Sequence, residues 1–122
     1  MSLNNFNKIL KEISPYAKKI GFDLGGEPLL NSETPEMIKA TTKKNISSTL
    51  TTNAHFLNEK IIPKLFEAGL KKIVISLGGI TKESYEFYHH KGNFDLAKKI
   101  SKSYVLKKNK ENQNIPLLKF HF

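Results

Sequence analysis

A carboxylate that directly follows two adjacent glycines is the group in this sequence with the clearest capacity for chemistry. It lies in the run FDLGGEP, residues 22–28, which predicts a short buried strand that ends in a tight turn. Glycine has no Cβ, so the backbone at Gly25 and Gly26 can approach a ligand closely. Pro28 restricts the backbone beside Glu27. These residues indicate a ligand site at the tip of a strand, although an ordinary turn would have the same composition.

Two more segments predict strands that end in polar or glycine residues. Residues Ile46–Thr52 alternate and are rich in β-branched side chains, and they lead into the polar pair Thr52-Asn53. Residues Lys72–Leu77 are nearly continuously apolar, as expected when helices cover both faces of a strand, and they carry Ser76 just before Gly78. Because the carboxyl ends of parallel strands meet at one edge, we expect these three strand ends to form one rim, where α/β folds bind ligands.

Helices of about a dozen residues alternate with these strands. The predicted helices are Phe6–Lys19 with Gly21 as its stop, Ser32–Lys43 with Ser32 as N-cap and Asn45 as its end, Asn58–Ala68 with Gly69 as its stop, a short one capped by Thr81, and Asp95–Leu106. The alternation predicts an α/β fold in a single domain, residues 1–122. We expect half of a TIM-like barrel, with helices outside four parallel strands in the sheet order Phe22–Leu24, Ile46–Thr52, Lys72–Leu77 and Leu117–Phe122.

The composition excludes several classes of function. The 122 residues contain no cysteine, which removes disulfides, thiolate metal ligands and a cysteine nucleophile. The net charge is +9, but all 20 basic residues are lysines scattered in pairs near predicted helix ends, and arginine, which specific nucleic-acid readers prefer, is absent. We therefore expect no specific nucleic-acid binding. No apolar run is long enough for a membrane span and no signal peptide is visible, so a cytoplasmic location is expected. The histidines lack metal-ligand spacing, and no metal site is predicted at His55, His89, His90 or His121.

With these residues in view, the chain resembles the radical S-adenosylmethionine (SAM) superfamily, most closely its peptide-modifying and maturation branch. The matching segments are DLGGEPLLN (23–31), TLTTNAHFL (49–57), VISLGGITKESYEFY (74–88) and KGNFD (91–95). The resemblance implies that Gly25, Gly26 and Glu27 receive the methionyl ammonium group of SAM, and that Ser76 meets a polar part of this cosubstrate while Asn53 supports the rim. Purely structural roles stay open: Asn53 and Ser76 would cap the helices that follow them, and Glu27 would cap the helix that begins near Ser32.

The sequence also departs from this family. The family's CxxxCxxC loop, whose three thiolates hold a [4Fe–4S] cluster, has no counterpart here. The family's Asp after the fourth barrel strand is Gly78, and an expected Arg is replaced by His89 or His90. We therefore expect that this chain cannot bind the cluster. It would supply the second to fifth strands of a radical SAM barrel, either as a truncated piece of a larger enzyme or as a diverged short relic.

These residues are consistent with two functions. The first is the SAM-binding portion of a radical SAM, iron–sulfur oxidoreductase-type enzyme that is catalytically incomplete by itself, with no residue assigned a catalytic role. The alternative is a non-enzymatic α/β module that uses the same rim to bind a ligand or a protein partner. The predicted outer strands Phe22–Leu24 and Leu117–Phe122 would expose unpaired backbone groups, so a homodimer built on one of these edges is also expected.

Overall fold

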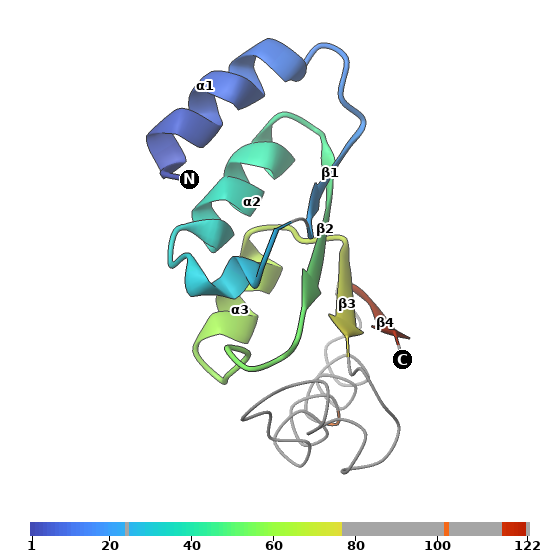
Figure 1. Ribbon diagram of the computed structural model, residues 1–122. Helices are drawn as coiled ribbons and strands as arrows, with labels where there is room; N and C mark the ends of the chain where they lie inside the picture. The colour runs from blue at the N-terminus through green and yellow to red at the C-terminus, as the bar shows by residue number, and fades with distance from the viewer. Residues whose placement is uncertain (24, 77–101, 103–115, 122) are drawn as a thin grey trace.

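The computed structural model describes residues 1–23, 25–76, 102 and 116–121 (Figure 1). The elements follow one another as α1 (Leu3–Ile13), β1 (Lys19–Phe22), the short 3₁₀ helix η1 (Pro28–Leu30), α2 (Thr34–Lys43), β2 (Ser47–Thr52), α3 (Ile61–Glu67), β3 (Lys72–Ser76) and β4 (Leu117–His121). Strands and helices therefore alternate over the first 76 residues, as the sequence predicts. Leu24, Leu77, Phe122, the short helix expected at Thr81 and the helix expected at Asp95–Leu106 lie outside the described residues.

The strands form one sheet in the order β1-β2-β3-β4, and all neighbours are parallel. This confirms the predicted fold class and the predicted strand order. Parallel neighbours need a crossover between them, and α2 and α3 provide the crossovers from β1 to β2 and from β2 to β3. The resulting twisted sheet with helices along it is the architecture of a partial TIM-like barrel.

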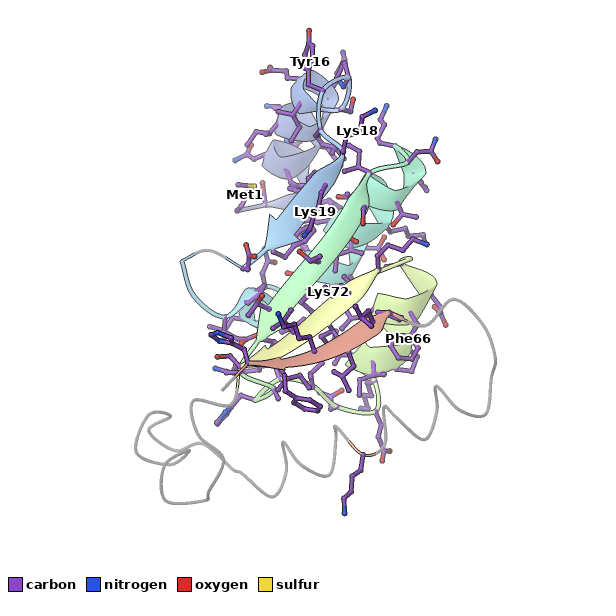
Figure 2. The ribbon with its side chains drawn as sticks, turned by 90° about the vertical axis from the view of Figure 1, so that its right-hand side faces the viewer. Met1, Tyr16, Lys18, Lys19, Phe66 and Lys72 are labelled. Atoms are coloured by element: carbon purple, nitrogen blue, oxygen red, sulfur yellow. The ribbon has the colours of Figure 1, made fainter. Side chains whose placement is uncertain are left out.

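Helices α1, α2 and α3 lie on one face of the sheet, and Figure 2 looks onto the opposite face. The core lies between the sheet and the helices, where Leu50, Ile73 and Ile75 are at most 1% exposed and pack with Ile38 and Leu65. Along β3 the buried isoleucines alternate with half-buried residues. The prediction that helices cover both faces of this strand is therefore not met by the described helices. The second face is the side that a barrel turns inward.

The first helix and the first strand differ from the prediction. Helix α1 ends at Ile13 instead of Lys19, because Pro15 has no N–H to continue the helical ladder. The amides of Tyr16 and Ala17 both bond to the carbonyl of Ile13, and the chain turns there. Strand β1 therefore begins at Lys19 and ends at Phe22, so the boundaries predicted for this strand are wrong. Gly21, predicted to stop the helix, lies inside β1 instead.

The other predicted helix ends are closer to the structure. Helix α2 begins at Thr34 after Glu33, so Ser32 is not its N-cap, but Asn45 ends the segment as predicted, with a positive φ of 57°. Helix α3 is shorter than predicted and begins at Ile61. Gly69 follows it with φ of 82°, and a Cβ at this position would lie 2.7 Å from a methyl carbon of Thr42. Both the backbone conformation and the close neighbour therefore require glycine here. Within the described residues, no helix has the length and apolarity needed to cross a bilayer.

The two outer strands of the described sheet, β1 and β4, generate a prediction about assembly. Each pairs with a described neighbour on one side only, and open strand edges are templates for pairing with a second chain. We expect a homodimer at one of these edges. Light scattering at micromolar concentration is expected to give twice the chain mass of 13.9 kDa. Repeating the measurement in high salt controls for non-specific attraction of the +9 chain, and a monomer under both conditions would contradict the prediction.

Candidate functional site

A cavity of about 310 Å³ lies at the carboxyl ends of β1, β2 and β3. Its lining residues are Asp23, Gly26, Glu27, Thr51, Thr52, Asn53 and Ser76. Four of the five predicted site residues are therefore brought together: Gly26, Glu27, Asn53 and Ser76. The fifth, Gly25, lines an adjacent cavity of about 410 Å³ that shares Gly26 and Glu27 with the first. Residues from three separate strand ends converge here because the parallel register aligns those ends.

The glycines make the turn possible through their backbone conformation. Gly25 has φ of 84° and Gly26 has φ of 137°, both in the region that side chains with a Cβ rarely adopt. A Cβ added at either position would meet no heavy atom within 4 Å. The space beside this stretch of backbone is therefore open, as a site that accepts part of a ligand requires.

The carboxylate of Glu27 is the centre of the hydrogen bonding in the site. Its Oε1 accepts from the Thr52 hydroxyl at 2.7 Å and from the Leu29 amide at 3.1 Å. Its Oε2 accepts from the Asn53 amide at 2.8 Å. Hydrogen bonds to an ionised acceptor are roughly twice as strong as neutral ones. Glu27 thus fastens the turn after β1 to the end of β2, across 25 residues of sequence.

These bonds change the interpretation of Glu27. A carboxylate has about four positions that accept hydrogen bonds, and the chain itself occupies three of them. The one remaining acceptor position is on Oε2. Glu27 can therefore accept a single hydrogen bond from a ligand, in addition to the three bonds by which it holds the turn in place. Glu27 does cap a helix, but the alternative that it caps the helix near Ser32 is wrong. Its side chain caps η1 by accepting a hydrogen bond from the Leu29 amide.

Thr52, the main side-chain partner of Glu27, belongs to the strand-end pair Thr52-Asn53. The sequence alone predicts no role for its hydroxyl. Its side chain is only 2% exposed, and its hydroxyl donates to Glu27 and accepts from the Ala54 amide at 3.1 Å. Ala54 has a positive φ of 68°, which is rare for a residue with a Cβ. The hydroxyl therefore helps to hold the strained turn that follows β2. Threonine at the end of a strand is too common for sequence alone to single it out.

Asn53 and Ser76 complete the rim of the cavity. The Asn53 side chain accepts from the His55 amide at 2.9 Å and so forms a local turn. At the start of α3 it is the Asn58 side chain that accepts from the amides of Lys60 and Ile61. The alternative that Asn53 caps the following helix is therefore wrong. Ser76 is the last residue of β3 and is half-buried. The residues that follow it lie outside the described part of the chain, so its capping alternative is not tested.

The family model that matches this sequence is the radical SAM superfamily, over residues 1–112. The chain belongs to the radical SAM superfamily. Enzymes of this superfamily use SAM together with a [4Fe–4S] cluster. These matches do not decide the branch of the superfamily, so the predicted maturation branch stays a prediction.

Curated relatives are much longer than this chain. It is 37% identical over 101 residues to a probable GTP 3′,8-cyclase of Methanococcus maripaludis strain C5, which covers 81% of this chain and 33% of the relative. It is 41% identical over 81 residues to the GTP 3′,8-cyclase of Aliarcobacter butzleri, covering 65% and 24%. An Fe-coproporphyrin III synthase of Methanosarcina barkeri is 26% identical over 97 residues, covering 80% and 24%. The chain thus spans about a quarter to a third of the length of these relatives.

Solved structures show the same architecture. An open conformation of BtrN aligns with a TM-score of 0.58 and 28% identity, covering 69% of this chain and 42% of BtrN. BtrN in complex with AdoMet and 2-DOIA aligns with a TM-score of 0.61 and 19% identity, covering 99% and 44%. The second likeness, at this low identity, supports the fold alone. The partial barrel is therefore supported by the sheet topology and by these neighbours together.

The residues present fit one of the two family cofactors. An open glycine turn beside a carboxylate with one unused acceptor position suits the ammonium group of SAM. The thiolates that hold a [4Fe–4S] cluster have no source in a sequence without cysteine. The cluster therefore does not fit this chain.

The contact between Thr52 and Glu27 gives a prediction about stability. Thr52→Val removes the hydroxyl while it keeps the shape, and it leaves the Ala54 amide without this acceptor. We expect the free energy of unfolding to fall by about 1–3 kcal/mol, measured by urea denaturation. Thr52→Ser keeps the hydroxyl and is expected to lose clearly less.

Thr41→Val is the matched control, because this buried hydroxyl bonds only to a carbonyl in its own helix. We expect a smaller loss there, since the carbonyl of Met37 keeps its place in the helical ladder. Equal stability of the Val and Ser variants at position 52 would show that the hydroxyl does not brace the rim.

Proposed function

We propose that this chain is the SAM-binding portion of a radical SAM enzyme and is catalytically incomplete by itself. The observation that carries the proposal is the convergence of Gly26, Glu27, Asn53 and Ser76 on one cavity at the strand ends. In this superfamily SAM supplies radical chemistry after reductive cleavage. The residues described here would bind and orient the cosubstrate.

The chemistry of the methionyl ammonium group supports its placement beside the glycine turn. An ammonium group is a donor only, and it needs oxygen acceptors at close range with a compensating charge. Glu27 supplies the charge, and its Oε2 has acceptor capacity beyond the bond from Asn53. The positive φ values at Gly25 and Gly26 leave the neighbouring space open. Ser76, on the opposite side of the cavity, is proposed to contact another polar part of the cosubstrate.

The missing cysteines support catalytic incompleteness. Reductive cleavage needs an electron, and the cluster that delivers it in this superfamily has no thiolate ligands in this sequence. The same observation favours the second candidate function, a non-enzymatic binding module that diverged from the family. A measurement of SAM binding distinguishes these two functions. The SAM-binding portion of an enzyme must bind SAM, whereas a chain that does not bind SAM is better explained as a diverged binding module.

Isothermal titration calorimetry with SAM tests the site. We expect measurable binding to the wild-type chain, and Glu27→Ala is expected to weaken it by roughly tenfold, which corresponds to about 1.4 kcal/mol. Glu36→Ala is the charge-matched control, because Glu36 is an exposed carboxylate in the first turn of α2. It is expected to bind like the wild type. Equal heats for the wild type and Glu27→Ala would dismiss the site, and no binding to the wild type would reject the proposed function.

Anaerobic reconstitution with iron and sulfide tests catalytic incompleteness. We expect no iron-dependent visible absorbance and no 5′-deoxyadenosine after reduction with dithionite in the presence of SAM, because no thiolate is available to hold iron. A cysteine-containing radical SAM enzyme, treated in parallel, is the positive control. Formation of 5′-deoxyadenosine by this chain above the background of the reagents would show that the expectation is wrong.

A further inference from the structure

Gly21 lies in the interior of strand β1, where a glycine weakens the strand and often marks a close approach by another group. The flanking residues Ile20 and Phe22 pack toward the helices. Gly21 therefore faces the opposite side of the sheet, onto which Figure 2 looks. A Cβ added at Gly21 would lie 2.8 and 3.0 Å from the two carboxylate oxygens of Asp23. The space that a side chain at position 21 would fill thus holds the Asp23 carboxylate.

The Asp23 carboxylate lines the site and has no partner within the described part of the chain. It lies with Glu27 on the wall of the cavity of about 310 Å³ and on that of the adjacent cavity of about 410 Å³. The amide and hydroxyl donors of the site bond to Glu27. No described residue donates a hydrogen bond to Asp23 or forms an ion pair with it. The two carboxylates of the site are therefore in different situations, one braced and one free.

The wall of the smaller cavity is negatively charged. Its described lining residues are two carboxylates, two threonines, one asparagine, one serine and one glycine, so none of them is positively charged. Lys19 and Lys72 begin their strands and thus lie toward the amino end of the sheet, away from the cavity. Complementary charge favours recognition of one ligand over another. A ligand with two positive groups would therefore match this wall, whereas a ligand with one would leave a carboxylate unpaired.

SAM carries two positive groups, the methionyl ammonium and the sulfonium, and these groups have different requirements. Only three carbon atoms separate the nitrogen from the sulfur, so both groups would enter the same cavity. An ammonium donates hydrogen bonds and needs acceptors. A sulfonium has no N–H or O–H to donate, and a nearby negative charge is enough for it. Glu27, with one acceptor position left, suits the ammonium, which leaves Asp23 for the sulfonium.

We propose that Asp23 is the counter-charge for the sulfonium of SAM, and that the missing side chain of Gly21 allows this carboxylate to lie over β1. Asp23 is then a specificity residue. It favours SAM over S-adenosylhomocysteine, which has the same ammonium and carboxylate groups but a neutral sulfur. This inference rests on the proposed function, because it takes SAM as the ligand of the cavity.

The competing explanation is that Asp23 only offsets positive charge on this face of the sheet. In the row of Gly21, Thr49 of β2 comes next and Lys72 of β3 follows. Lys72 is thus two strands away, roughly 10 Å between backbones, and exposed charges at such a separation are largely screened by salt. A structural role would affect the binding of both ligands alike, whereas a counter-charge for the sulfonium affects SAM alone.

The experiment measures the affinities of the full chain for SAM and for S-adenosylhomocysteine by calorimetry. Asp23→Asn keeps the shape of the side chain and removes its charge. We expect it to weaken SAM binding by about fivefold, the upper end for an exposed ion pair, and S-adenosylhomocysteine binding by less than about twofold. Asp23 is exposed, so the variant is expected to fold, which circular dichroism checks.

Two further variants separate position from charge. Gly21→Ala keeps the charge of Asp23 but displaces it, because the new Cβ would meet the carboxylate. It is expected to weaken SAM binding by about twofold to fivefold and to leave S-adenosylhomocysteine binding unchanged. Glu12→Gln is the matched control, since it removes the same charge from an exposed residue of α1. We expect both affinities to stay as in the wild type.

The other outcomes overturn the inference. Equal weakening of both ligands by Asp23→Asn would mean a structural role, and an equal effect of Glu12→Gln would mean net charge alone. Wild-type SAM affinity in Asp23→Asn and Gly21→Ala would show that the carboxylate does not meet the sulfonium. Glu27→Ala is read separately, because loss of the ammonium contact weakens both ligands. The inference fails alone if Glu27→Ala weakens SAM binding and Asp23→Asn does not. If the wild type does not bind SAM, the proposed function fails and this inference fails with it.

Discussion

The carboxylate of Glu27 is the contact on which the geometry of the rim depends. It joins the turn after β1 to the last residue of β2 and to the backbone beyond it, with bonds of 2.7 and 2.8 Å. Backbone hydrogen bonds between parallel strands fix the strands, but they stop where the strands end. The segments that approach a ligand need other fastening, and a charged acceptor shared among three donors provides it. A ligand that uses the remaining capacity of Oε2 would therefore be bound by a group that is already held in place.

One face of the sheet contributes to the stability of the fold, and the other face is available for binding. The face toward the helices buries aliphatic side chains such as Leu50 and Ile75, and this burial supplies the hydrophobic contribution to folding. The opposite face carries hydroxyl, lysine and histidine side chains, such as those of Thr51, Lys72 and His121, because alternate residues of a strand point to opposite sides. A polar second face would be costly for a sheet enclosed by helices on both sides. On the inner side of a barrel it is a surface for polar ligands.

Close contacts between α2 and the turn after α3 keep the crossovers in register. The Thr42 hydroxyl donates to the carbonyl of Ala68 at 2.7 Å, and its methyl carbon occupies the place where a side chain at Gly69 would begin. The start of β3 thus follows directly from a turn that is held against α2. Since β3 delivers Ser76 to the cavity, this packing far from the site contributes to the placement of a site residue.

The sequence by itself determined the α/β class, the order of the parallel strands and four residues of the cavity, because alternation, glycines and strand-end polarity are local signals. It misplaced β1, since Pro15 ended α1 early and the apolar spacing continued past it. Only the tertiary structure decided that Glu27 braces Thr52 and Asn53, because a hydrogen bond between residues 25 positions apart depends on strand register. Register aligns residues that no local pattern connects.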